Sequence, residues 1–310
     1  MEVYRGLSEY LPAKNAVVTT GTFDGVHVGH KTIINNLKKV AADFDGETVL
    51  VTFHPHPRLV LEKDCGLKLL STIDERIELL EKEGVDHLII IPFDKEFSRM
   101  SSMEFVREIL VEQIGTKKLV IGYDHHFGRN REGSFSHLLE FGPLYGFEVE
   151  EIPAFDVNHV NVSSTKIREA LDSGDIITAT KFLGQPYKLS GEVVRGEQLG
   201  RSIGYPTANI KVKEAYKLIP QQGVYVVGVT IGKEHLFGML NVGVRPTVSA
   251  EKEVSIEVNI FDFDQDIYGS QIKIDFIKHI RNEIQFDSVN ELKLQLEQDL
   301  FLCKKILSKV

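Results

Sequence analysis

The hydrophobic pattern changes near residue 184, and this change constrains the fold more than any other feature of the sequence. Before it, short apolar runs alternate with segments in which apolar residues recur at helical spacing. After it, apolar and polar residues alternate along short segments until a final amphipathic stretch. Because domains usually run to about 100–200 residues, we expect an α/β domain over residues 1–184 and a β domain over residues 185–310.

The first half repeats a strand–helix unit. Two capping boxes, at Thr72 and Ser101, predict helices that end at Gly84 and Gly115. Another helix is expected after the first strand, where apolar residues recur from Ile33 to Phe44. The predicted strands are apolar along their length and cover residues 16–20, 48–53, 85–91, 118–122 and 147–152. Such strands are typical of a parallel sheet with helices on both faces, so we expect a Rossmann-like domain.

The second half has the pattern of a small antiparallel β-barrel followed by a helix. Strands over 223–232 and 235–242 flank a short turn, and alternation over 254–260 and 272–276 predicts two more strands. Ser288 caps the final helix. Its apolar stripe, which we expect to pack on the barrel, comprises Val289, Leu292, Leu296, Leu300, Cys303 and Leu307.

The composition is that of a globular protein with an acidic balance, since 42% of the residues are hydrophobic and the formal net charge is -9. The basic surface that broad nucleic-acid binding needs is therefore not expected. The longest apolar runs have the length of strands, and the N-terminus lacks the layout of a signal peptide. Cys65 and Cys303 are too few and too far apart for a disulfide framework. We expect a cytoplasmic monomer or weak oligomer that binds small molecules, and neither nucleic acid nor membranes.

A glycine-rich turn, Gly21 to His30, joins the first strand to the first helix. Ligands bind at this end of the strands in a parallel sheet, and a helix N-terminus attracts phosphate. His27 and His30 project from one side of the first helical turn, where imidazoles can donate hydrogen bonds to phosphate oxygens. A metal-binding pair or two surface histidines are the alternatives. The turn residues expected to contact ATP are Gly21, Phe23, Asp24, Gly25 and Gly29.

A second phosphate-binding segment, Val162 to Arg168, opens a later helix. It offers the hydroxyls of Ser163, Ser164 and Thr165 and the charge of Arg168 at a helix N-terminus. Alone, it also has the pattern of an ordinary serine cap before a charged helix. Both segments together, in this order on an α/β framework, predict a nucleotidyltransferase.

The two segments resemble the HxGH and KMSKS-like motifs of the nucleotidylyltransferase superfamily. Residues 52–57, Thr-Phe-His-Pro-His-Pro, and residues 122–128 resemble one branch of it, the FMN adenylyltransferases, as do Arg131 and Gly133. The resemblance implies that four residues lie near the flavin or the nucleotide: Phe53, Pro55, His56 and Asp124.

The same segments depart from the branch in one place and invite one other reading. His125-His126 stands where the branch commonly has Phe-Arg or a similar pair. The histidines of these segments also suggest zinc, but the prolines at 55 and 57 and the lack of paired carboxylates disfavour it.

The resemblance implies a reaction in which the FMN phosphate attacks the α-phosphorus of ATP and pyrophosphate leaves. The attacking phosphate is already anionic, so the reaction needs positioning and charge stabilisation rather than a protein base. His27, His30 and Arg168 would bind the triphosphate and the leaving group. Mg²⁺ would neutralise the remaining charge.

In the second half, residues 196–209 form a loop rich in glycine and polar residues. By spacing alone it is an ordinary exposed loop. Its end, Gly-Tyr-Pro-Thr-Ala-Asn, resembles the Pro-Thr-Ala-Asn signature of riboflavin kinases. The resemblance implies that Thr207 and Asn209 hold Mg²⁺ and ATP, through oxygen atoms that suit a hard cation. It also places Gly200 and Gly204 at the ATP site.

Glu257 lies on the polar face of a predicted strand, where a solvated glutamate is the ordinary reading. The surrounding residues 256–263 resemble the catalytic segment of riboflavin kinases, although that family often has His at the position of Asn259. The resemblance implies that Glu257 accepts the proton of the riboflavin 5′-hydroxyl. It also implies that Arg281 and Phe286 lie near the flavin.

Taken together, the motifs resemble the bifunctional riboflavin kinase/FMN adenylyltransferase family, also called bacterial FAD synthetases, over nearly the whole chain. That family implies conversion of riboflavin to FMN in the barrel and of FMN to FAD in the α/β domain. The alternatives are a monofunctional FMN adenylyltransferase, an aminoacyl-tRNA synthetase fragment and a flavin-sensing regulator of nucleic acid. The intact Thr207, Asn209 and Glu257 disfavour the first, and the acidic balance disfavours the other two.

Overall fold

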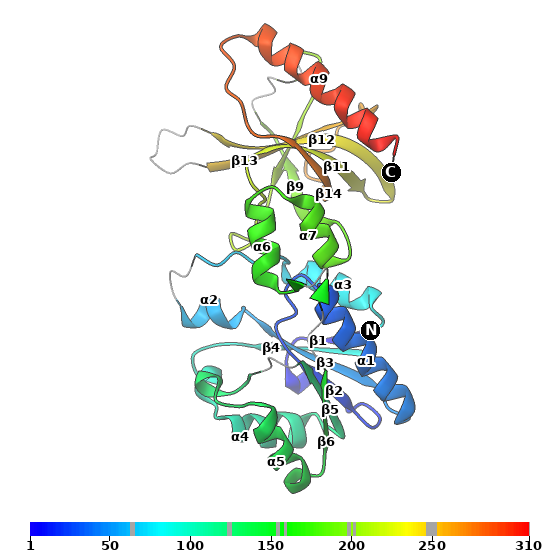
Figure 1. Ribbon diagram of the computed structural model, residues 1–310, viewed down its shortest axis with the longest axis vertical. Helices are drawn as coiled ribbons and strands as arrows, with labels where there is room; N and C mark the ends of the chain where they lie inside the picture. Colours follow the sequence, from blue (N-terminus) through cyan, green and yellow to red (C-terminus); the bar gives the residue numbers. More distant parts are fainter. Residues whose placement is uncertain are drawn as a thin grey trace. The chain divides into compact units, whose positions relative to one another are not determined.

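The computed structural model describes residues 1–62, 66–122, 126–152, 156–157, 160–196, 200, 203–245 and 253–309 (Figure 1). The chain divides into two compact units, Met1–Ser164 and Thr165–Val310, which are described one at a time. The boundary that the sequence suggests, between residues 184 and 185, stays a prediction.

The first unit is built on a six-stranded parallel sheet with the strand order β1-β4-β3-β2-β5-β6. The strands are β1 (Glu2–Tyr4), β2 (Val17–Thr20), β3 (Thr48–His54), β4 (His87–Pro92), β5 (Lys118–Gly122) and β6 (Glu148–Ile152). The Rossmann-like parallel sheet is therefore confirmed. β2 pairs with β3 on one side and with β5 on the other, so the order in which strands are added to the sheet reverses at β2. A ligand crevice is expected at the carboxyl end of the strand where this reversal occurs.

Helices cover both faces of this sheet (Figure 1). They are α1 (Val28–Asp43), α2 (Pro57–Leu61), α3 (Ile73–Lys82), α4 (Ser102–Glu104) with a π-helical continuation (Phe105–Gln113), and α5 (Phe135–Tyr145). Neighbouring residues of β3 face opposite ways: Leu50 packs with Ile34 of α1, whereas Val49 and Val51 pack with Phe105. Both predicted capping boxes are present, at Thr72 and at Ser101.

Shorter elements follow the sheet. A two-stranded ribbon joins β7 (Asp156–Val157) and β8 (Val160–Asn161). After it come α6 (Ser164–Asp172) and α7 (Ile176–Leu183), which ends at Gly184 in a left-handed conformation. The α6 helix begins where the first compact unit ends, so its first residue, Ser164, and its later residues fall in different units.

The second unit contains a closed antiparallel barrel with the strand order β10-β13-β12-β11-β14-β9. The strands are β9 (Tyr187–Val194), β10 (Ala208–Lys211), β11 (Gly223–Ile231), β12 (Glu234–Arg245), β13 (Glu253–Ile260) and β14 (Gln271–Arg281). The predicted hairpin is the β11–β12 pair, which turns at Gly232 with a φ of 58°. Alternate residues such as Leu240 and Val258 are fully buried, as a barrel interior requires.

The last helix, α9 (Val289–Leu307), lies along one side of the barrel (Figure 1). Cys303 is fully buried there against Val224 and Met239, which confirms its expected place in the core. Val289 is 53% exposed, so its predicted place in the packed stripe is wrong. The apolar contacts with the barrel come from later turns, from Leu296 onward. No helix of the described residues is long and apolar enough to cross a membrane.

Candidate functional site

The carboxyl end of β2 carries a stacked pair of histidines. His27 is the N-cap of α1, and its Nδ1 accepts a hydrogen bond of 3.4 Å from the backbone N–H of His30. The two imidazole rings stack with their centroids 3.6 Å apart and their planes at 15°. The ring of Phe23 also packs against His30, with a centroid distance of 5.0 Å and a tilt of 53°. The predicted pair is therefore held as one rigid unit at a helix N-terminus, where phosphate is attracted.

The glycines of the turn leave room for these rings. A Cβ at Gly29 would lie 3.2 Å from Cε1 of His27, and a Cβ at Gly21 would lie 3.1 Å from the Phe23 ring. The turn also carries positive φ angles at Phe23 (48°) and Val26 (43°), a conformation that costs non-glycine residues free energy. Such strain persists only where surrounding contacts enforce it.

Asp24 supplies such contacts for the turn, and its carboxylate is therefore not open to solvent. Its side chain accepts hydrogen bonds from the backbone N–H groups of Leu70 and Ser71, each at 3.0 Å, and it is 1% exposed. Ser71 Oγ in turn accepts a bond of 3.0 Å from the N–H of Gly25. Ser164, at the start of α6, donates to the backbone carbonyl of Asp24 at 3.2 Å. Two of the predicted ATP-contact residues are thus brought together, with Asp24 fixing the turn.

A buried arginine lies close to the histidine pair. Arg76 of α3 is 1% exposed, and its Nη1 donates to Thr52 Oγ1 at 3.3 Å and to the carbonyl of Phe53 at 3.5 Å. Burial lowers the pKa of His30 well below its usual range, and His27 and Arg76 lower it further. Burial and the Arg76 charge also lower the pKa of His54. His30 and His54 are therefore held in their neutral form at neutral pH.

The predicted flavin-contact residues Phe53, Pro55 and His56 lie at the end of β3 or directly after it. The His54–Pro55 peptide bond is cis, and His56 caps α2 by accepting a bond of 3.2 Å from the N–H of Arg58. Phe53 lies 5.9 Å from the rings of both Phe93 and Phe97, which follow β4. These half-exposed rings form an apolar surface that sequence reasoning missed. Asp124, predicted to lie near the flavin, falls outside the described residues.

The second phosphate-binding segment is only partly tied to the first. Ser163 is half-buried just before α6, and Ser164 begins that helix. Thr165 and Arg168 lie on α6 beyond the end of the first unit, and Ile167 between them is fully buried. The roles of Thr165 and Arg168 toward ATP therefore stay predictions.

The barrel carries a hydroxyl–carboxylate pair on its outer face. Thr207 Oγ1 donates a hydrogen bond of 3.2 Å to Oε2 of Glu257 on β13. Glu257 stands directly opposite Asn209 of β10 and Asn241 of β12. Residues directly opposite each other in antiparallel strands share a face, so these side chains form one polar row. Val258, the next residue of β13, points into the barrel and is fully buried.

The loop before β10 is shaped to meet this row. A Cβ at Gly196 would overlap the side-chain amide of Asn209, and a Cβ at Gly200 would overlap the carbonyl of Tyr205. Gly204 has a φ of 88°. At Gly196 the backbone therefore lies closer to the Asn209 side chain than a residue with a Cβ would allow. Arg201, which belongs to the same loop, lies outside the described residues.

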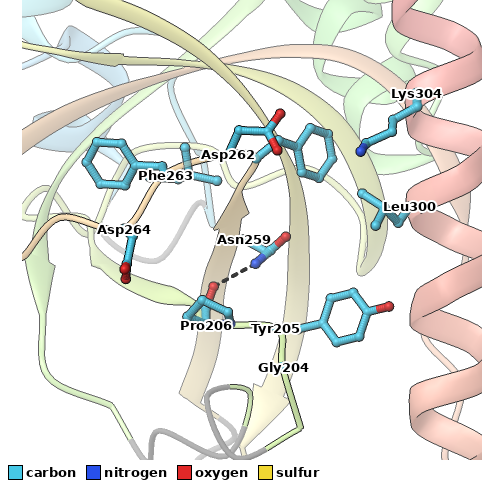
Figure 2. A pocket seen from close by; sticks show the side chains of 11 residues that line it. Gly204, Tyr205, Pro206, Asn259, Asp262, Phe263, Asp264, Leu300 and Lys304 are labelled. Carbon is cyan, nitrogen blue, oxygen red and sulfur yellow. Dashed lines mark hydrogen bonds between the residues drawn. The ribbon is translucent and has the colours of Figure 1, made fainter.

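A cleft of about 310 Å³ adjoins the same row. Gly204, Tyr205 and Pro206 line one side of it, and the end of β13 and the loop after it line another. Asn259 Nδ2 donates a hydrogen bond of 2.7 Å to the carbonyl of Pro206, which ties these two walls together (Figure 2). Lys304 of α9 and Asp262 also line the cleft (Figure 2). Asn259, which departs from the common family pattern, therefore joins β13 to the loop before β10.

Arg281 is held by a partner that sequence reasoning missed. Its Nε donates to both carboxylate oxygens of Asp299, at 3.1 and 3.0 Å, and its Nη2 donates to Oδ2 at 2.8 Å. Asp299 lies on α9 and is 2% exposed. The Arg281 guanidinium also lies 5.9 Å from the ring centroid of Phe286. The pair fastens α9 to β14, and the flavin contacts of Arg281 and Phe286 stay predictions.

The residues of the barrel site fit a magnesium ion that arrives with ATP. Thr207 and Asn209 offer a hydroxyl and an amide oxygen beside the Glu257 carboxylate. Mg²⁺ prefers oxygen ligands and is usually bound by few protein groups, with water and phosphate oxygens completing its shell. Within the described part of the chain, no group of three or more His, Cys, Asp or Glu residues is placed to hold a metal ion unaided.

A parallel sheet with a His-x-Gly-His turn and a closed barrel with a Thr–Glu pair define a class of two-domain, nucleotide-dependent transferases. A family profile described as FAD synthetase matches residues 11–166, and one described as riboflavin kinase matches residues 183–307. The chain belongs to the bifunctional riboflavin kinase/FMN adenylyltransferase family. The family, the enzyme class and the fold class that the sequence predicts are confirmed.

Individual relatives agree with this assignment. The bifunctional riboflavin kinase/FMN adenylyltransferase of Haemophilus influenzae is 37% identical, and the match covers 98% of each chain. That of Escherichia coli K12 is 35% identical, with 96% of each chain covered. The crystal structure of a macrolide-efflux protein from Streptococcus pneumoniae is similar with a TM-score of 0.88 at 32% identity, and the match covers 98% of each chain. The last comparison shows the same fold.

Proposed function

We propose that this chain makes FAD from riboflavin in two ATP-dependent steps, each at a site of its own. The barrel phosphorylates riboflavin to FMN, and the site at the carboxyl end of β2 joins FMN to the adenylyl group of ATP. The hydrogen bond from Thr207 to Glu257 supports the first assignment, because the carboxylate proposed as the base lies beside a predicted ATP ligand. A barrel that only binds flavin would need no such pair.

In the kinase step, Glu257 accepts the proton of the riboflavin 5′-hydroxyl as that oxygen attacks the γ-phosphorus of ATP. The γ-phosphoryl bond to the β-phosphate oxygen breaks, and ADP leaves. Thr207 orients the carboxylate through its hydrogen bond, and Asn209 presents its amide oxygen from the neighbouring strand. Magnesium, when bound with ATP, neutralises the phosphate charge.

In the adenylyl-transfer step, the FMN phosphate oxygen attacks the α-phosphorus of ATP and pyrophosphate leaves. The stacked His27 and His30 donate hydrogen bonds to the triphosphate from the α1 N-terminus. Arg168 joins the two histidines in binding the triphosphate and the leaving group, and Ser163, Ser164 and Thr165 contact ATP, as the family resemblance implies. Phe53, Phe93 and Phe97 offer an apolar surface on which the flavin ring can pack.

The remaining features of the proposal rest on composition and on the family. We place the enzyme in the cytoplasm, because a chain with only two cysteines does not depend on disulfides and suits a reducing compartment. We expect a monomer or weak oligomer whose partners are ATP, riboflavin and FMN. The division into a domain of residues 1–184 and one of residues 185–310 belongs to the same proposal.

One assay tests both activities. The protein is incubated with riboflavin, ATP and Mg²⁺, and the flavins are separated by chromatography. Accumulation of FAD, after a transient of FMN, supports the proposal. Accumulation of FMN alone contradicts adenylyl transfer, whereas conversion of added FMN without any use of riboflavin contradicts the kinase assignment.

A further inference from the structure

We propose that Arg131 binds the phosphate group of FMN, and that Glu132 positions it by fastening the loop after β5 to the start of α4. The inference rests on the proposed function and deepens it, because it names the group that recognises the phosphate of the second substrate. Arg131 belongs to residues 127–133, which follow β5 on the carboxyl side of the sheet. β5 is the direct neighbour of β2, whose carboxyl end carries the histidine turn.

The backbone of this loop is held in an unfavourable conformation at Arg131. Its φ is 59°, and the φ of Asn130 before it is 54°. Asparagine tolerates this left-handed region comparatively well, whereas arginine does not. Such strain persists only where surrounding contacts enforce it, and it is concentrated at ligand-binding and catalytic sites. An arginine kept at this position therefore points to a task for its side chain.

Contacts with the segment after β4 enforce the conformation. The backbone N–H of Ser102, the first residue of α4, donates to Oε1 of Glu132 at 3.0 Å. The backbone N–H of Arg129 donates to the carbonyl of Met100 at 2.8 Å. A Cβ at Gly128 would lie 2.6 Å from the backbone nitrogen of Ser102, so the loop packs directly on the start of the helix.

The base of the loop packs against a row of aromatic rings that leads to the proposed flavin surface. Phe127 is buried and its ring lies 5.9 Å from that of Phe105, which in turn lies 6.3 Å from the ring of Phe97. Phe97 and Phe53 are two of the rings on which we propose that the flavin packs. The contacts of Glu132 and its neighbours therefore hold the loop beside the place proposed for FMN.

The guanidinium of Arg131 is free to bind an anion. The side chain is exposed, and within the described part of the chain it forms no ion pair and no hydrogen bond. Arg129 differs, because it lies close enough to Glu104 to lower the pKa of that carboxyl, although hydrogen bonds with Ser101 lower it more. A guanidinium can hold a phosphate through two parallel hydrogen bonds, which fixes the orientation of the phosphate as well as binding it.

The test separates the charge of Arg131 from its backbone strain. Arg131→Asn removes the charge and relieves the strain, whereas Arg131→Lys keeps both. Arg129→Gln removes a charge from the same loop at a residue whose φ is not positive, and it is the matched control. Adenylyl transfer is measured with added FMN, so that the reaction of the barrel is not needed.

We expect Arg131→Asn to raise the KM for FMN about tenfold or more, as loss of a hydrogen bond between charged groups would. The KM for ATP and the values of the Arg129→Gln control should stay within about twofold, and Arg131→Lys within about threefold. The Tm of Arg131→Asn should not fall and should rise by up to about 4 °C. Weaker binding in a chain that is at least as stable is an outcome that a merely structural role of Arg131 does not give.

Two further measurements locate the contact. Lumiflavin, which has the flavin ring but no phosphate, is used as a competitor of FMN, and its inhibition constant should be the same in Arg131→Asn as in the unmodified protein. Glu132→Ala should raise the KM for FMN at least about threefold. Glu132→Gln, which keeps an acceptor oxygen for the N–H of Ser102, should restore the ordinary value.

The proposal is overturned if Arg131→Asn leaves the KM for FMN within about threefold, or if Arg129→Gln raises it equally. A rise in the KM for ATP instead would assign Arg131 to the triphosphate and contradict the proposal. Failure of Arg131→Asn to fold, seen by circular dichroism, contradicts the argument from strain. If the unmodified protein makes no FAD from FMN, the proposed function fails, and the affinity of the same variants for FMN, measured by its fluorescence, then decides on Arg131.

Discussion

Replacement of Glu257 by glutamine tests the kinase mechanism most directly. The amide oxygen of Glu257→Gln can still accept the hydrogen bond that Thr207 donates at 3.2 Å, so the local geometry is kept. What the amide cannot do is take a proton from the riboflavin 5′-hydroxyl. The change therefore removes the base while leaving the binding surface nearly intact.

The expected loss follows from what a general base contributes. Removal of one slows a reaction by about 10²–10⁴-fold, which is about 3–5 kcal/mol of transition-state stabilisation. Glu257 is half-buried and keeps its acceptor, so the unfolding free energy should change by less than about 1 kcal/mol. The effect should therefore appear in kcat, with little change in the KM for ATP.

The assay measures both reactions on one preparation. FMN formation is followed with riboflavin as substrate and FAD formation with added FMN, and adenylyl transfer should keep its full rate. Glu234→Gln, an exposed strand glutamate on β12, is the matched control and should leave both rates unchanged. A fall in FMN formation of less than about tenfold, or loss of both activities together, would refute the assignment of Glu257 as the base.

Three further outcomes are expected. The double change His27→Ala with His30→Ala should cut FAD formation from FMN by about 10²-fold or more and leave FMN formation unchanged in the same two assays. Asp299→Asn should destabilise the barrel unit by about 2–3 kcal/mol, seen as a lower Tm in calorimetry, because Arg281 loses the charge of its buried partner. Burial lowers the pKa of His279 in the folded protein. As the pH falls, this side chain therefore takes up a proton in the unfolded chain at a higher pH than in the folded one. The unfolding free energy in urea should therefore fall as the pH drops below about 6.5, and less steeply in His279→Leu.

Local patterns in the sequence predicted the elements that local interactions fix. The capping boxes at Thr72 and Ser101 satisfy backbone N–H groups within one turn, so spacing alone reveals them. The three-residue strand β1 escaped prediction because its pairing with β4 is distant in sequence. The π-helical stretch after α4 has ordinary helical periodicity in sequence, and its altered winding is not encoded in that pattern.

The same distinction applies to the sites. His27 and His30 share one helical turn, and their pairing could be read from a spacing of three residues. Arg76 reaches Thr52 across two elements, and Asp299 reaches Arg281 from another helix, so no spacing rule identifies either contact. The Phe93 and Phe97 rings join Phe53 only once β3 and β4 lie side by side. Sequence reading therefore found the residues that share an element, and the structure adds those that meet across elements.

The net charge of -9 does not determine how the two proposed sites bind ATP, because the charges close to each site differ. At the histidine turn, the nearby carboxylate of Asp24 is occupied by backbone N–H groups, and the buried charge of Arg76 lies close by. At the barrel, the Glu257 carboxylate stands beside the predicted ATP ligands, so it repels the same phosphates. A base near a triphosphate works only if a cation offsets that repulsion. We therefore expect the barrel site to depend on a divalent cation more strongly than the histidine site, where the buried charge of Arg76 lies close by.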